Sequence, residues 1–89
     1  MSSGSVTIIN RLGLHARAAT RLVNCASSFE SEIYVIKGAR SVNGKSIMGV
    51  LTLAAAKGTE LIIKAEGSDE QKAFEAIKKL IGNRFGEDD

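Results

Sequence analysis

The chain has no proline and no tryptophan, and it contains one cysteine, Cys25, and one histidine, His15. A single cysteine excludes a disulfide within the chain, and one cysteine with one histidine is too few for a Cys/His zinc site. No run approaches the roughly 20 apolar residues of a membrane span. Residues 1–5 lack the charged and apolar regions of a secretory signal. We therefore expect a cytoplasmic protein without a disulfide, a metal, a cofactor or a membrane contact.

The chain of 89 residues suits one domain spanning 1–89, with loose tails at 1–4 and 86–89. Changes in apolar period predict four strands and three helices. Ser68 begins a predicted capping box for the last helix. Cys25 lies at the apolar edge of the first helix, where we expect it to be a small packed side chain. The predicted strands are 6–9, 33–36, 41–43 and 59–65, and the predicted helices are 16–28, 45–51 and 69–84. This order predicts an α+β fold with helices on one face of a mostly antiparallel sheet.

Charge is distributed unevenly along the chain. Residues 1–65 hold eight basic and three acidic residues, whereas residues 66–89 hold four basic and seven acidic ones. Arg11, Arg17 and Arg21 lie near His15 in sequence, and their positive field favours an anionic ligand or an acidic partner. A nucleic-acid-binding domain is disfavoured, because aromatic residues are few and the basic residues form no dense run.

His15 lies between a glycine turn and the start of a predicted helix. An ordinary imidazole has a pKa near 6.5, so much of it is a neutral nucleophile in a cell. The amides of Ala16 and Arg17 and the Arg17 guanidinium could then receive a bound phosphoryl group. No carboxylate lies within twelve residues of His15 along the chain, so no local group is expected to activate water. This pattern favours a phosphoryl carrier over a hydrolase, although a capping or loop histidine without chemistry would fit the same spacing.

A second candidate site is the short helix that begins at Ser46. Ser46 is a good N-cap, and a phosphate there would also be favoured by the helix dipole. The apolar residues Ile47, Met48, Val50 and Leu51 exceed what one face of a short helix can bury, so part of them could form a docking patch. The alternatives, a simple cap and a purely buried cluster, remain open on these residues alone.

Three segments resemble one family. They are 14–17 (LHAR), 42–50 (VNGKSIMGV) and 56–59 (AKGT), and the chain is similar through them to the histidine-containing phosphocarrier (HPr) family of the bacterial phosphotransferase system. The resemblance spans about residues 5–85. Residues 10–18 and 83–89 are similar to the nitrogen-regulatory branch of that family.

The resemblance implies an open-faced β-sandwich, in which three helices cover one face of a four-stranded antiparallel sheet in the order β-α-β-β-α-β-α. It implies phosphorylation of His15 on Nδ1 by enzyme I, stabilisation by Arg17, and transfer to an enzyme IIA component. It also implies phosphorylation of Ser46 by an HPr kinase/phosphorylase. Nothing in the sequence suggests an obligate dimer, so we expect a monomer. The implied partner-docking residues are Leu14, Thr20, Arg21, Ile47, Met48, Gly49 and Leu51.

One position departs from the family pattern, because Ala18 stands where the family has proline. Proline would fix φ and remove one donor from the first helical turn, so alanine is expected to loosen the turn without preventing the helix. The leading hypothesis is a phosphocarrier. The alternative is a binding module regulated at Ser46, in which transfer through His15 is secondary.

Overall fold

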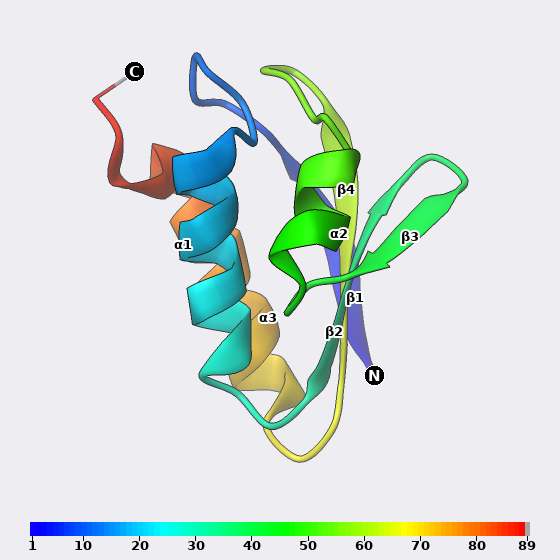
Figure 1. The fold of residues 1–89 in the computed structure, drawn as a ribbon. Helices are drawn as coiled ribbons and strands as arrows, with labels where there is room; N and C mark the ends of the chain where they lie inside the picture. The colour runs from blue at the N-terminus through cyan, green and yellow to red at the C-terminus, as the bar shows by residue number, and fades with distance from the viewer. Residues whose placement is uncertain (89) are drawn as a thin grey trace.

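Four strands form one antiparallel sheet in the order β1-β4-β2-β3 (Figure 1). The computed structural model describes residues 1–88. In β4, Leu61 and Ile63 are fully buried, whereas Ile62 between them is 40% exposed, as expected when one sheet face meets the core and the other meets solvent. The strands are β1 (Ser2–Thr7), β2 (Glu32–Lys37), β3 (Arg40–Asn43) and β4 (Glu60–Glu66).

Three helices cover the inner face of this sheet (Figure 1). They are α1 (Ala16–Ser27), α2 (Ile47–Thr52) and α3 (Glu70–Gly82), and a short 3-10 turn, η1 (Arg84–Gly86), follows α3. Helix α1 buries Leu22 and Ala26, and α3 buries Ile77 and Ile81. Cys25 packs against this core, and burial raises the pKa of its thiol. The α+β fold with an open sheet face is confirmed, and no helix within residues 1–88 is long and apolar enough to cross a membrane.

The first strand begins earlier than its sequence suggests. We expected residues 1–4 to be loose, but Ser2–Thr7 pairs with β4 from Ser2 opposite Ala65 to Thr7 opposite Glu60. Serine and glycine have low strand propensity, and pairing with β4 overrides it here. Gly4 also allows α3 to approach the sheet, because a Cβ at Gly4 would lie 2.8 Å from a ring carbon of Phe74.

The predicted capping box at Ser68 does not form. Asp69 is the N-cap of α3 and makes no side-chain cap bond. Its carboxylate instead accepts hydrogen bonds from the backbone N–H groups of Glu30 and Ser31, both at 3.0 Å, and from the Ser31 hydroxyl. The carboxylate of Asp69 thus joins the loop before β2 to the start of α3, and this long-range use replaces the local cap.

Candidate functional site

His15 is the N-cap residue of α1. Its backbone is extended, its side chain caps no amide, and its carbonyl accepts the Ala19 N–H at 2.8 Å. The amides of Ala16, Arg17 and Ala18 are the first three of the helix, so the helix itself supplies no acceptor for them. The imidazole is 27% exposed. It therefore stands at the surface, beside a helix start whose partial positive charge suits an anion.

The loop before His15 is tightly held. Gly13 has a φ of +68° and its N–H donates to the Asn10 carbonyl at 3.1 Å. The fully buried Asn10 side chain returns a bond from Nδ2 to the Gly13 carbonyl at 2.7 Å. Leu14 donates its N–H to the Ala55 carbonyl at 2.8 Å and is 4% exposed. Leu14 is thus an anchor in the core, and its buried side chain offers little surface to the partner that it was predicted to contact.

A carboxylate does contact His15, and it comes from the other end of the chain. Oε2 of Glu87 lies 2.5 Å from Nε2 of His15, and Oε1 of Glu87 accepts a bond of 2.9 Å from Nδ2 of Asn10. No carboxylate is close to His15 in the sequence, but the folded structure brings Glu87 into contact with the imidazole. The expectation that no carboxylate lies near the imidazole is therefore wrong. Residues 86–89 were expected to form a loose tail, but Glu87 within it is held by two side-chain hydrogen bonds; residue 89 lies outside the described residues. The opposite charges of the tail and of the arginines near His15 were the available signal.

The tail reaches His15 because the residues before Glu87 are anchored. Phe85 is 1% exposed and packs in the core. Arg21 of α1 donates a hydrogen bond from Nη1 to the Phe85 carbonyl. Arg84 and Phe85 both have a φ of +55°, a left-handed conformation that costs a non-glycine residue about 1–2 kcal/mol. The fold therefore holds this turn against local strain.

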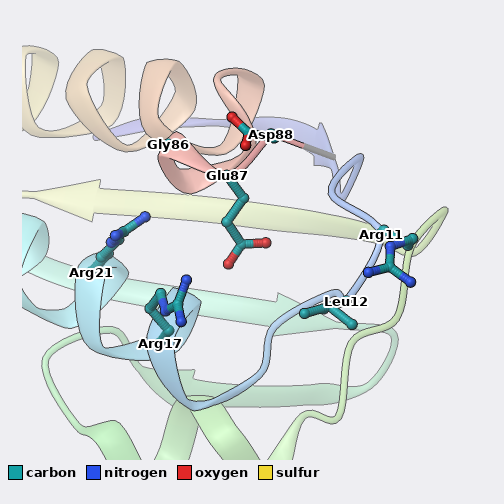
Figure 2. A pocket seen from close by; sticks show the side chains of 7 residues that line it. All are labelled: Arg11, Leu12, Arg17, Arg21, Gly86, Glu87 and Asp88. Atoms are coloured by element: carbon teal, nitrogen blue, oxygen red, sulfur yellow. The ribbon is translucent and has the colours of Figure 1, made fainter.

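Three arginines line the cleft into which the Glu87 side chain points. A cleft of about 230 Å³ is lined by Arg17 and Arg21 of α1, by Arg11 and Leu12 of the loop, and by residues 86–88 of the tail (Figure 2). Burial works to raise the pKa of Glu87, but hydrogen bonds from Asn10 and His15 and the positive charges of His15 and Arg17 outweigh it. The pKa of Glu87 therefore lies below its ordinary value, and the side chain is ionised at neutral pH.

The second candidate site lies on α2, which packs beside α1. Ser46 is its N-cap, half-buried, with Oγ accepting the Gly49 N–H at 3.1 Å. Val50 is fully buried, whereas Ile47, Met48 and Leu51 are 41%, 74% and 36% exposed. Of the two interpretations left open for these apolar residues, the exposures contradict the purely buried cluster and leave an exposed apolar patch. On α1, Thr20 and Arg21 are also exposed.

The chain matches a known protein family over most of its length. The family described as "PTS HPr component phosphorylation site" matches residues 2–83. The chain belongs to the HPr family. It is 51% identical to phosphocarrier protein HPr of Neisseria meningitidis, covering 98% of each chain, and 47% identical to that of Cupriavidus necator, again covering 98% of each.

Solved structures of HPr proteins agree with this assignment. The structure of HPr-C-His from Thermoanaerobacter tengcongensis has a TM-score of 0.96 and is 43% identical, with 99% of each chain covered. The fold and the family are therefore those of an HPr phosphocarrier protein of the phosphotransferase system. Glu87 lies beyond the segment that the family match covers.

Proposed function

We propose that this chain accepts a phosphoryl group on His15 from phospho-enzyme I and passes it to an enzyme IIA component. The observation that carries the proposal is the imidazole at the open N-terminus of α1, with Arg17 beside it. A phosphoryl group on this ring would meet the amides of Ala16 and Arg17, the positive end of the helix dipole and a guanidinium. These groups stabilise the negative charge of a phosphoryl group, and none of them is a base that would promote its hydrolysis.

A carrier must also protect its phosphoryl group from water. The Glu87 carboxylate is the nearest candidate base, but both of its oxygens already have partners, Asn10 on one and His15 on the other. These bonds lower the pKa of the Glu87 carboxyl, so it is a weak base for taking a proton from a water molecule. Slow hydrolysis is therefore expected to follow from the occupied carboxylate oxygens, and not from the absence of a carboxylate.

Intact mass measurement tests the carrier function. The protein is incubated with enzyme I and phosphoenolpyruvate, and the expected result is a gain of one acid-labile phosphate. His15→Ala should abolish that gain, and Arg17→Ala should slow it while leaving the acceptor in place. A wild-type protein that gains no phosphate from competent enzyme I would refute the proposal.

Regulation at Ser46 is a second proposal, supported by its position beside the exposed Ile47, Met48 and Leu51. A phosphate on Ser46 would add about two negative charges next to this apolar patch, which we propose as part of the docking surface together with Gly49, Thr20 and Arg21. Incubation with HPr kinase/phosphorylase and ATP should add an acid-stable phosphate that Ser46→Ala abolishes. If only this second phosphate forms, the chain is a regulatory binding module.

A further inference from the structure

The contact between Glu87 and His15 involves only one of the two ring nitrogens. Oε2 of Glu87 lies 2.5 Å from Nε2 of His15. A carboxylate can only accept a hydrogen bond, so the proton between these atoms belongs to Nε2 when the ring is neutral. A neutral imidazole carries one ring proton. The other nitrogen, Nδ1, therefore keeps a free lone pair.

We propose that Glu87 is a positioning residue for the phosphoryl transfer, which holds the proton on Nε2 of His15 and leaves Nδ1 as the nucleophile. This inference rests on the proposed carrier function. The arrangement corresponds to a nucleophilic group oriented by a third residue, a recurring device in covalent catalysis. Here the orienting carboxylate comes from the end of the chain and the nucleophile from the start of α1.

The position of Glu87 is itself fixed from two sides. Nδ2 of the buried Asn10 donates both to Oε1 of Glu87 and to the Gly13 carbonyl, so one amide group braces the tail and the His15 loop together. The anchoring of Phe85 and the Arg21 bond to its carbonyl hold the preceding turn. As a result the Glu87 side chain is only 10% exposed. It points from the tail into the cleft, toward Arg17 of α1 (Figure 2).

The charge of Glu87 matters as much as its geometry. In the transfer, the Nδ1 lone pair forms a bond to phosphorus, while the bond from phosphorus to the donor atom of phospho-enzyme I breaks and that atom keeps the electron pair. The ring still carries its Nε2 proton, so it becomes cationic. The Glu87 carboxylate faces that new positive charge directly, and transfer to the next protein reverses the same step.

Two substitutions of Glu87, to alanine and to glutamine, distinguish a positioning role from a purely structural role. The two roles predict opposite orders of the transfer rate in these variants. In Glu87→Ala the carboxylate is lost, and the single proton of the neutral ring can be on either Nδ1 or Nε2. In Glu87→Gln the single side-chain oxygen must face Asn10, because Asn10 presents a donor there. The glutamine NH₂ group then faces Nε2, which has to accept, and the ring proton moves to Nδ1 and blocks the nucleophile.

Because His15 is the only histidine, ¹⁵N NMR of labelled protein reads its two ring nitrogens directly. At a pH where the ring is neutral, wild-type protein should show a protonated Nε2, Glu87→Ala a mixture, and Glu87→Gln a protonated Nδ1. Glu75→Gln removes an acidic charge from α3, at a position that does not line the cleft, and should keep the wild-type nitrogen shifts.

Single-turnover phosphorylation by enzyme I supplies the second measurement. Glu87→Ala should be about tenfold slower than wild type, or about 1.4 kcal/mol in the barrier, and Glu87→Gln should be slower still. A merely structural role predicts the reverse order, since glutamine preserves the shape of the side chain.

Wild-type nitrogen shifts in both Glu87 variants would overturn the proposal. So would faster transfer in Glu87→Ala, which would mean that the tail obstructs the cleft. If wild-type protein accepts no phosphate, the carrier function has failed, and the nitrogen shifts still decide whether Glu87 holds the Nε2 proton.

Discussion

The turn that presents His15 can be tested by adding one methyl group to Gly13. Gly13 and Gly38 both have left-handed backbones, with φ values of +68° and +59°. A Cβ at Gly13 would lie 2.5 Å from the Ala55 carbonyl oxygen and 2.9 Å from Cα of Ala56, whereas a Cβ at Gly38 would meet no heavy atom within 4 Å. Both substitutions therefore place an alanine in a left-handed backbone conformation. Gly13→Ala also brings its Cβ into collision with the backbone of Ala55 and Ala56, whereas Gly38→Ala does not.

The two variants should differ clearly in stability. A left-handed alanine costs about 1–2 kcal/mol, and the loss of glycine entropy in the unfolded chain returns about 0.4–1 kcal/mol, so Gly38→Ala should cost about 1 kcal/mol net. In Gly13→Ala the loop must also move away from Ala55, which breaks the 2.8 Å bond from the Leu14 N–H to the Ala55 carbonyl. Leaving those buried groups unpaired adds about 1–3 kcal/mol, for a total of about 2–4 kcal/mol.

Urea unfolding measures both changes, and phosphorylation by enzyme I at a temperature where both variants are folded measures the effect on His15. Gly13→Ala should slow transfer because the loop that carries His15 has shifted, while Gly38→Ala, in the turn between β2 and β3, should transfer at the wild-type rate. Equal losses of stability in the two variants would refute the argument from the Ala55 collision. Wild-type transfer by Gly13→Ala would show that this turn does not position His15.

Two further predictions concern α1 and α3. Ala18 is the third residue of α1, so its N–H has no acceptor within the helix, and Ala18→Pro should leave the transfer rate unchanged or raise it; a clear slowing in the same assay would contradict this account of the helix start. The bond from the Ser31 hydroxyl and those from the Glu30 and Ser31 N–H groups hold the pKa of Asp69 below its ordinary value of 3.8. The stabilisation that this carboxylate provides is therefore complete above about pH 4 and is lost as the pH falls through the lower folded-state pKa. Asp69→Asn should be less stable than wild type in urea at pH 7, and the difference should shrink in strong acid; a difference that is the same at both pH values would exclude Asp69 ionisation as its cause.

Most of the secondary structure was predictable because its signals are local. The alternation of Leu61, Ile63 and Ala65 with outward residues defines β4 within one residue at each end of the prediction, and the apolar period of α1 predicts its length equally well. Residues 2–5 carry no such signal. They become a strand only because the edge of β4 is available to pair with them, so their conformation depends on contacts that a local pattern does not contain.

The same distinction separates the two halves of the site. His15, Ala16 and Arg17 are neighbours in sequence, and the helix start that groups them is a local feature. Glu87 is 72 residues from His15 along the chain, and its contact requires α1, α3 and the tail to be packed first. The sequence alone groups His15 with Ala16 and Arg17. It does not indicate the Glu87 carboxylate, because the contact between Glu87 and His15 depends on tertiary packing.

Several unfavourable features gather around His15, and their position argues for a functional origin. Arg84 and Phe85 adopt left-handed backbones, and Oδ1 of the buried Asn10 accepts no hydrogen bond from the described residues. The two left-handed residues cost about 1–2 kcal/mol each, and a more relaxed tail would avoid this backbone strain. What the arrangement achieves is the delivery of the Glu87 carboxylate to Nε2 of His15. Unfavourable local conformations are expected near a reactive group that must be held in one orientation. The positioning of His15 by Glu87 accounts for the left-handed residues that precede Glu87.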